Sequence, residues 1–229
     1  MDSMQTAFEE RPLCLVDMLN DQEKQLMSER CTTRCVAPGT TLFLQATART
    51  ETLLIRKGLV RTYYISPHGK EVTVGYWSAG DIVGGPDFYG KCKHIWSCEA
   101  IEVTEVWAIK GHDLQELARA VPAVAECIVI ALSFKLRWVS LLLQNMGTES
   151  VSHRLAFLML SLGKMYGVTC NEGVKIRYLF TQEELANMIC ATRQWVSVTF
   201  KRFQRDGIIK ISNRHIILSD IVALQAITE

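Results

Sequence analysis

The chain has 229 residues, of which 48% are hydrophobic and 21% are charged, and its formal net charge is +1. This composition excludes a disordered chain, and the length suffices for one large domain or two ordinary domains with buried cores. The balanced total excludes a chain that attracts polyanions through its overall field. The charge is uneven, however, at +3 from residue 148 onward and −2 before it, so local clusters matter more than the total.

The sequence predicts neither a secretory signal nor a membrane span. The first thirteen residues carry four charged side chains and no apolar run, so we expect no secretory signal. No segment reaches the roughly 18 consecutive apolar residues of a membrane span. Eight cysteines in such a chain indicate reduced thiols rather than a disulfide framework. We therefore expect a cytoplasmic protein without a membrane partner.

Residues 36 to about 110 have the pattern of short strands between turns. Segments such as TLLIRKGLVRTYYIS and KEVTVGYWS are rich in Val, Ile, Thr and aromatic residues, and glycines and prolines separate them. Strand signals every 8–12 residues favour a small antiparallel barrel or roll. SPHGKE is the expected turn of a hairpin between two of these strands.

A helical pattern follows the strands. A short helix, HDLQELARAVP, ends at Pro122, and a long helix is expected from Ala123 to Met146. The long helix is apolar over too wide a face for one barrel to cover, so a coiled-coil seam of a homodimer is predicted. The alternative is the core helix of a single globule. The apolar stripe comprises Val124, Ile128, Ala131 or Leu132, Leu136, Val139, Leu142 or Leu143, and Met146.

The region after Gly147 has the element order of a winged helix-turn-helix. SVSHRLAFLMLSLGKMYG predicts an amphipathic helix and VKIRYLF a strand, and two closely spaced helices follow within TQEELANMICATRQWVSVTFKRF. The last segment, GIIKISNRHIILSD, predicts a β-hairpin. The expected fold class is therefore α+β, with an antiparallel β-roll at 1–120, a dimerisation helix at 121–147 and a winged helix-turn-helix at 148–229.

The two closely spaced helices carry strong boundary signals. Thr181 and Glu184 form a T-x-x-E capping box at the start of the first, and Thr192 is the expected N-cap of the second. Cys190 and Ala191 supply the turn. The second helix buries a stripe formed by Val196, Phe200 and Phe203.

The opposite face of the second helix has the chemistry that a DNA major groove requires. An Arg can donate two hydrogen bonds to guanine, and a Gln can pair with adenine. Ser, Lys and helix N-termini suit phosphates, which fix register. The alternative is an ordinary solvated helix face. The predicted DNA-binding residues are Thr181, Gln182, Thr192, Arg193, Gln194, Ser197, Lys201 and Arg202.

The whole chain resembles the CRP/FNR family of bacterial transcription regulators over roughly residues 35–225. The resemblance rests on KGLVRTYYISPHGKEVTVGYWSAGDIVG and on QEELANMICATRQWVSVTFKRFQRDGII. It implies a β-roll sensor domain, a dimer helix and a DNA-binding winged helix that acts on RNA polymerase. It also implies two recognition helices about 34 Å apart on a palindromic site of double-stranded DNA.

Departures from the family pattern indicate a different operator. Gln194 replaces the family's recognition Glu, Val198 replaces a guanine-reading Arg, and Cys190 replaces the turn Gly; Trp195 is bulkier than usual. We therefore expect a palindrome other than the common TGTGA half-site. Arg193 is expected to read a guanine and Gln194 an adenine.

The expected effector is a small molecule bound between the β-roll and the dimer helix. Cyclic AMP is disfavoured, because Gly85 stands at the family's ribose-binding Glu, and His94 and Ile95 stand near its phosphate-binding Arg-Ser pair. Aromatic residues with a few polar groups suit an organic effector, or are simply core. The candidate effector residues are Gly84, Gly85, His94, Trp96, Lys135, Trp138, Val139 and Ser140.

Redox, haem or metal-cluster sensing is the alternative signal. Cys14, Cys31, Cys35, Cys92 and Cys98 are the cysteines of the N-terminal half before residue 100, although their spacing is looser than an iron–sulfur cluster requires. His94 and Cys92 are candidate haem ligands. Cys190 is a candidate redox residue, because oxidation would add bulk and charge against DNA phosphate; the alternative is a small turn filler. We assign no metal site and no certain cofactor.

An enzyme is not expected. The five histidines are scattered, no paired catalytic carboxylates stand out, and no Gly-rich phosphate loop precedes a helix. A second alternative is a sensor module that dimerises but does not bind DNA. Salt-dependent binding of a palindromic duplex would distinguish the two.

Overall fold

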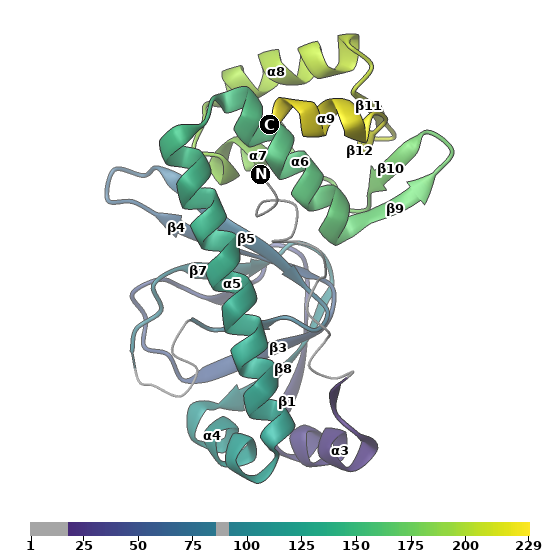
Figure 1. The fold of residues 1–229 in the computed structure, drawn as a ribbon. Helices are drawn as coiled ribbons and strands as arrows, with labels where there is room; N and C mark the ends of the chain where they lie inside the picture. Colours follow the sequence, from purple (N-terminus) through teal and green to yellow (C-terminus); the bar gives the residue numbers. More distant parts are fainter. Residues whose placement is uncertain (1–17, 86–91) are drawn as a thin grey trace. The chain divides into compact units, whose positions relative to one another are not determined.

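The computed structural model describes residues 18–85 and 92–229 (Figure 1). The described residues form two compact units, and the boundary between Leu136 and Arg137 falls inside the long helix α5 (Pro122–Thr148). The fold class is α+β, as predicted.

The N-terminal unit contains two four-stranded sheets whose named strand pairs are all antiparallel. The first has the strand order β1-β8-β3-β6, formed by Thr32–Val36, Thr104–Lys110, Glu51–Lys57 and Ile82–Val83. The second has the order β2-β7-β4-β5, formed by Thr41–Phe43, Ser97–Ala100, Leu59–Ile65 and Glu71–Ser78. The predicted β-roll is therefore present.

The SPHGKE segment makes the predicted hairpin turn between β4 and β5. The backbone N–H of Gly69 donates to the Ser66 carbonyl at 2.9 Å, and the Ser66 N–H donates to the Lys70 carbonyl at 2.8 Å. Gly69 has a φ of +77°, in the left-handed region that glycine reaches without a Cβ clash.

Helices close one end of the N-terminal unit. Helix α3 (Asp21–Arg30), helix α4 (Gly111–Ala120) and the first turns of α5 contribute buried apolar side chains to one cluster with the first sheet. Met27, Leu117 and Val124 are almost completely buried in it. These contacts fix the N-terminal half of α5 against its own unit.

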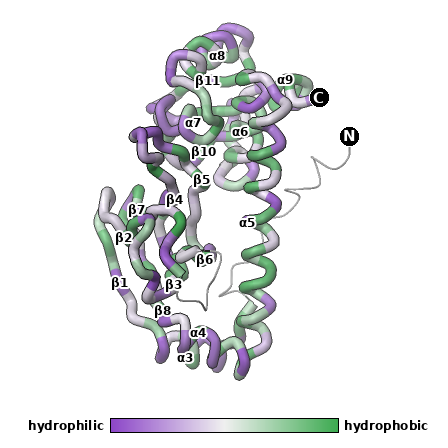
Figure 2. The backbone as a smooth tube through the Cα atoms, turned by 90° about the vertical axis from the view of Figure 1, so that its left-hand side faces the viewer, coloured by the Kyte–Doolittle hydropathy of each residue, from purple (hydrophilic) through white to green (hydrophobic). Residues whose placement is uncertain are grey.

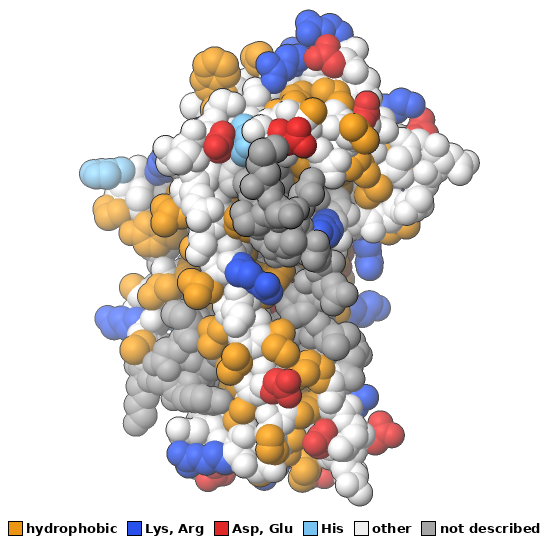
Figure 3. Space-filling model, viewed as in Figure 1, with side chains coloured by type: hydrophobic (Ala, Val, Ile, Leu, Met, Phe, Trp, Pro, Cys, Tyr) orange, Lys and Arg blue, Asp and Glu red, His pale blue; other side chains and the backbone are white. Residues whose placement is uncertain are grey.

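Helix α5 has both buried and exposed apolar residues. Val124 and Ile128, which the sequence assigned to the dimer stripe, are buried, and so is Leu142. Figure 2 shows hydrophobic stretches along α5, and Figure 3 shows hydrophobic side chains gathered over it. The exposed apolar residues of α5 are Val129, Leu136, Val139, Leu143 and Met146.

Across residues 18–85 and 92–229, no helix alone combines enough length with enough apolar character to cross a membrane. Helices α4 and α5 reach that character only when taken together, across a bend of 118°.

The C-terminal unit is a winged helix-turn-helix. Helix α6 (Val151–Tyr166) precedes β9 (Gly167–Cys170) and β10 (Gly173–Ile176), and then come α7 (Gln182–Met188) and α8 (Arg193–Arg205). Strands β11 (Ile209–Ser212) and β12 (His215–Leu218) join β9 and β10 in an antiparallel sheet of order β11-β12-β10-β9, before α9 (Ile221–Ile227).

One local prediction in this unit needs correction, and two elements were not predicted. The strand predicted over VKIRYLF ends at Ile176, and Phe180 is buried outside any strand. Strand β9 and helix α9 were not predicted. Helix α9 begins at an Asp220 N-cap, whose carboxylate accepts from the Ala223 N–H at 2.9 Å, so a short capping signal was present in the sequence.

Candidate nucleic-acid interface and effector site

Helix α7 begins where the sequence predicted. Thr181 Oγ1 accepts a hydrogen bond from the Glu184 N–H at 3.1 Å, and Glu184 Oε2 accepts from the Thr181 N–H at 2.7 Å. This reciprocal capping box satisfies two of the unpaired donors of the first turn. Gln182 follows as the first helical residue and is half-buried.

The turn between α7 and α8 is held by a strained residue and a long-range hydrogen bond. Cys190 has a φ of +50°, which is uncommon for a residue with a side chain. The Ala191 N–H donates to the Ala186 carbonyl at 3.0 Å. Arg154 of α6 donates from Nη1 to the Ile189 carbonyl at 2.9 Å. Together these contacts fix the angle at which α8 leaves the turn.

Helix α8 is anchored along one side. Thr192 caps it by accepting from the Trp195 N–H at 3.3 Å. Val196, Phe200 and Phe203 are buried as predicted, and α8 contacts α6, α7 and β11. Thr199 is buried too, and its hydroxyl is satisfied by donating to the Trp195 carbonyl within the helix. The opposite side of α8 therefore stays accessible.

The outward side of α8 follows from helical geometry. Successive residues of a helix are about 100° apart, so four side chains lie within about 30° of the direction opposite the mean of the buried Val196, Thr199, Phe200 and Phe203. These are Gln194, Val198, Lys201 and Arg205, and all four are exposed. They form the outward line of α8.

The other predicted DNA-binding residues of α8 occupy its two flanks. Arg193 is exposed and Ser197 is half-buried on one flank. Arg202 lies on the other flank, where its Nη2 donates to the Ser152 hydroxyl of α6 at 2.7 Å. The structure therefore gathers Arg193, Gln194 and Lys201 on one accessible surface and holds Arg202 beside it.

The tip of the β11–β12 hairpin adds a residue that sequence reasoning did not assign to the interface. Asn213 and Arg214 both have positive φ, at +49° and +67°, as in a two-residue type I′ turn. Arg214 is exposed at this tip. The sequence did contain a signal for this residue, since an Asn-Arg pair separates two strands rich in β-branched residues. A cation at the tip of such a wing can contact a DNA phosphate.

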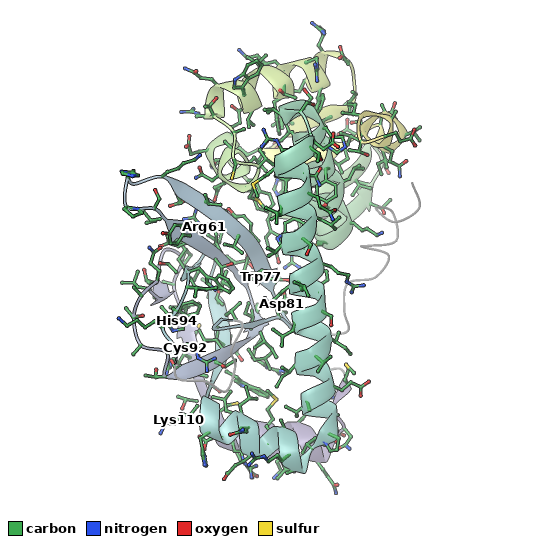
Figure 4. The ribbon with its side chains drawn as sticks, turned by 60° about the vertical axis from the view of Figure 1, so that its left-hand side comes forward. Arg61, Trp77, Asp81, Cys92, His94 and Lys110 are labelled. Atoms are coloured by element: carbon green, nitrogen blue, oxygen red, sulfur yellow. The ribbon has the colours of Figure 1, made fainter. Side chains whose placement is uncertain are left out.

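In the N-terminal unit, Lys135 lies against a sheet tryptophan. Its Nζ is 3.2 Å from the centre of the Trp77 ring, and Trp77 Nε1 donates to Thr62 Oγ1 at 2.8 Å. Burial lowers the pKa of Lys135 to about 8, while the nearby charge of Asp81 acts in the opposite direction. Figure 4 shows Trp77 and Asp81 beside α5.

A second group surrounds His94. Its ring is buried and stacks on Phe43 with centroids 4.0 Å apart and planes inclined by 10°. Burial lowers the pKa of His94, and a hydrogen bond with the Gly84 backbone opposes that effect. The structure thus brings His94 and Gly84 together, with Gly85 next in the chain and Trp96 half-buried. In Figure 4, His94 lies farther from α5 than Trp77 does.

The remaining candidate effector residues lie in the C-terminal unit. Trp138, Val139 and Ser140 follow the unit boundary on α5. Trp138 is buried, Ser140 is half-buried and Val139 is exposed. Val139 is thus available on the surface of α5.

The cysteines differ in environment. Burial raises the pKa of Cys31 to about 11 and also raises that of Cys98, which disfavours their thiolate forms. Cys35 and Cys92 are exposed, and Cys14 lies outside the described residues. Within 18–85 and 92–229, the group of three possible metal ligands within 4.8 Å of one another is His112, Asp113 and Glu116, which contains no cysteine.

Comparison with known families identifies both units. The family model for the cyclic nucleotide-binding domain matches residues 33–120, and that for the Crp-like helix-turn-helix domain matches residues 153–227. The chain belongs to the CRP/FNR family of transcription regulators. The two matches cover the β-roll and the helix-turn-helix in the order that this family has.

Individual relatives agree with this assignment. The chain is 27% identical over 220 residues to the anaerobic regulatory protein of Haemophilus influenzae, covering 94% of this chain and 84% of that one. It is 24% identical over 216 residues to the fumarate and nitrate reduction regulatory protein of Salmonella typhimurium, covering 94% and 86%.

Solved structures share the fold. A CooA mutant from Carboxydothermus hydrogenoformans superposes with a TM-score of 0.80 at 23% identity and covers 96% of this chain and 97% of its own. FixK2 from Bradyrhizobium japonicum superposes with a TM-score of 0.76 at 18% identity, covering 87% and 98%.

The environment of Lys135 predicts a specific pH dependence of stability. Its pKa is about 8 in the folded chain and 10.5 when unperturbed, so between these pH values the unfolded chain binds more protons. The free energy of unfolding should therefore rise through this window, by about 2 kcal/mol from this residue. Lys135→Met should remove that rise, whereas Lys110→Met, which changes an exposed lysine, should keep it.

Urea denaturation at pH 7, 8, 9 and 10 measures the effect. We expect the stability of Lys135→Met relative to the parent to be greatest at pH 7 and to decline toward pH 10. A constant stability difference across these four pH values would contradict a desolvated Lys135 ammonium.

Proposed function

We propose that this regulator is a homodimer that binds a palindromic duplex through α8 and responds to a small molecule bound by its N-terminal unit. The proposal rests on one observation about α8: one side of the helix is buried, while the outward line exposes polar and cationic side chains. A helix fixed in this way can enter the major groove without a large loss of conformational freedom.

Base recognition is assigned to the start of α8. Arg193 donates to guanine O6 and N7, and Gln194 bonds adenine N6 and N7. Both lie in the first turn of α8, where the recognition helix of this motif meets base edges. Because Gln194 replaces the family's Glu, the half-site differs from TGTGA.

Phosphate contacts are assigned to the surrounding groups. Lys201 on the outward line and Arg214 at the wing tip supply cations, and the N-terminal amides of α7 and α8 supply donors. Thr181, Gln182, Thr192 and Ser197 frame these termini. Arg202, positioned by Ser152, is a further phosphate contact. Control of transcription through RNA polymerase is inferred from the family alone.

Dimerisation is assigned to the exposed apolar stripe of α5. Val129, Leu136 and Leu143 recur every seven residues, and Val139 and Met146 form a second row with the same spacing. This is the a and d pattern of a two-stranded coiled coil. Leu136 and Leu143 are 69% and 67% exposed, a degree of exposure that favours a second helix as their partner.

The effector is assigned to the N-terminal unit, and it is not cyclic AMP. Gly85 offers no side chain to a ribose, and the buried, apolar-stacked His94 is a poor substitute for an arginine at a phosphate. Lys135 over Trp77 provides a cation and an aromatic face for a small organic molecule.

A second candidate signal is oxygen or redox state. It is favoured by relatives named as anaerobic and as fumarate and nitrate reduction regulators, and by the exposed Cys35 and Cys92. Cys190 is a further redox candidate at the turn before α8. Metal analysis and the ultraviolet–visible spectrum of anaerobically purified protein separate this signal from an organic effector.

Substitutions in α8 test the assignment of base and phosphate contacts. Selection from a randomised half-site should lose its guanine preference in Arg193→Ala and its adenine preference in Gln194→Ala, by about tenfold to hundredfold each. Lys201→Ala should weaken the binding of all duplexes equally. It should also lower the steepness with which the logarithm of the affinity falls with the logarithm of salt concentration by about one. Unchanged selection by Arg193→Ala would refute the guanine assignment.

Substitution of an exposed α5 leucine tests the dimer. Leu143→Asp should raise the dimer dissociation constant by at least about a hundredfold, because it introduces a charge into an apolar seam. Val222→Asp on α9 is the matched control, since Val222 is 75% exposed but lies off α5. Sedimentation equilibrium measures both, and a dimer that survives Leu143→Asp unchanged would exclude this seam.

A further inference from the structure

Val198 is the apolar residue on the outward line of α8. It is 62% exposed, whereas Gln194, Lys201 and Arg205 on the same line are polar or charged. The side chain is directed away from the buried stripe, within about 30° of the opposite direction. Val198 therefore lies off the face that packs α8 into its own unit.

Helix formation does not explain this valine. A β-branched residue loses rotamer freedom in a helix and is a weaker helix former than Lys, Gln or Arg. An exposed isopropyl group also gains no hydrophobic stabilisation while it remains in water. The position thus holds a residue that helps neither the helix nor the fold, which points to a contact made outside the chain.

The residues beside Val198 on α8 indicate which kind of group it would contact. Gln194 precedes Val198 by one turn, and side chains at this spacing are roughly 6 Å apart on the helix surface. Trp195, which is 60% exposed, precedes it by three residues and lies beside it. Val198 thus lies between Gln194, whose amide can pair with a base, and the indole ring of Trp195, which covers part of its surroundings from water.

We propose that Val198 selects a thymine by van der Waals contact with its C5-methyl group, an inference that rests on the proposed major-groove binding of α8. The thymine methyl is the apolar group that unmodified bases present in the major groove. Because base pairs are stacked about 3.4 Å apart, this thymine lies within about two base pairs of the adenine read by Gln194.

Removal of one methyl group from the DNA provides the test. Full-length protein first selects its half-site from a randomised duplex at low salt, and each selected thymine is then replaced by deoxyuridine, which lacks only the C5-methyl. One replacement should weaken binding by about fourfold, the value expected for one buried methyl group. The same replacement should have a much smaller effect on the Val198→Ala variant, which lacks the two methyl groups that reach the thymine.

Two further variants make the test specific. Val222→Ala changes a valine on α9 that is 75% exposed and should retain the fourfold response. Val198→Arg should exchange the thymine preference for guanine at the same position, because arginine can donate to guanine O6 and N7.

The outcomes distinguish this inference from the function on which it depends. A parent protein that binds its selected duplex tightly but ignores every thymine-to-uracil replacement overturns the role of Val198 and leaves DNA binding intact. An equal response in parent and Val198→Ala also overturns it, because the methyl would then act elsewhere. Selection of no sequence at all would instead refute the proposed function.

Discussion

The apolar contact beneath α8 is the interaction on which the proposed recognition surface depends. Val196, Phe200 and Phe203 are buried where α8 meets α6, α7 and β11. Each such side chain contributes about 2 kcal/mol or more to the free energy of burial. These contacts determine which side of α8 remains outside, and therefore which residues can reach a base.

Local backbone contacts then set the direction of α8. Cys190 adopts a left-handed conformation at the turn, and Arg154 holds the Ile189 carbonyl just before it. The Thr181 and Thr192 caps fix the first residues of both helices. Oxidation or displacement of Cys190 would thus act on a strained position that controls the angle at which α8 leaves the turn.

The helix-turn-helix was predictable from the sequence because its signals are local. Capping residues, a buried i, i+4, i+7 stripe and a hairpin turn each occupy a few neighbouring residues, and all of them are present in the structure. Strand β9 and helix α9 were missed because four and seven residues give too short a period to recognise. The end of β10 was misplaced because Tyr178 and Phe180 continue the apolar pattern outside a strand.

Long-range environments could be predicted only in part. The sequence singled out Lys135 and His94, but the stacking of His94 on Phe43 joins residues 51 positions apart and leaves no local pattern. Likewise, the apolar stripe of α5 could not be divided by sequence alone, since Val124 is buried in the unit while Leu136 is exposed. Tertiary packing decides such cases, and periodicity only identifies the residues that compete for burial.

The central claim is that two copies of α8 read the major groove, and dimethyl sulfate footprinting on the selected duplex tests it most directly. This reagent methylates guanine N7 in the major groove and adenine N3 in the minor groove. Two copies of α8 in the major groove should protect guanine N7 in two half-sites whose centres lie about one helical turn, or roughly 34 Å, apart. Protection of adenine N3 alone, or of a single half-site, would contradict it.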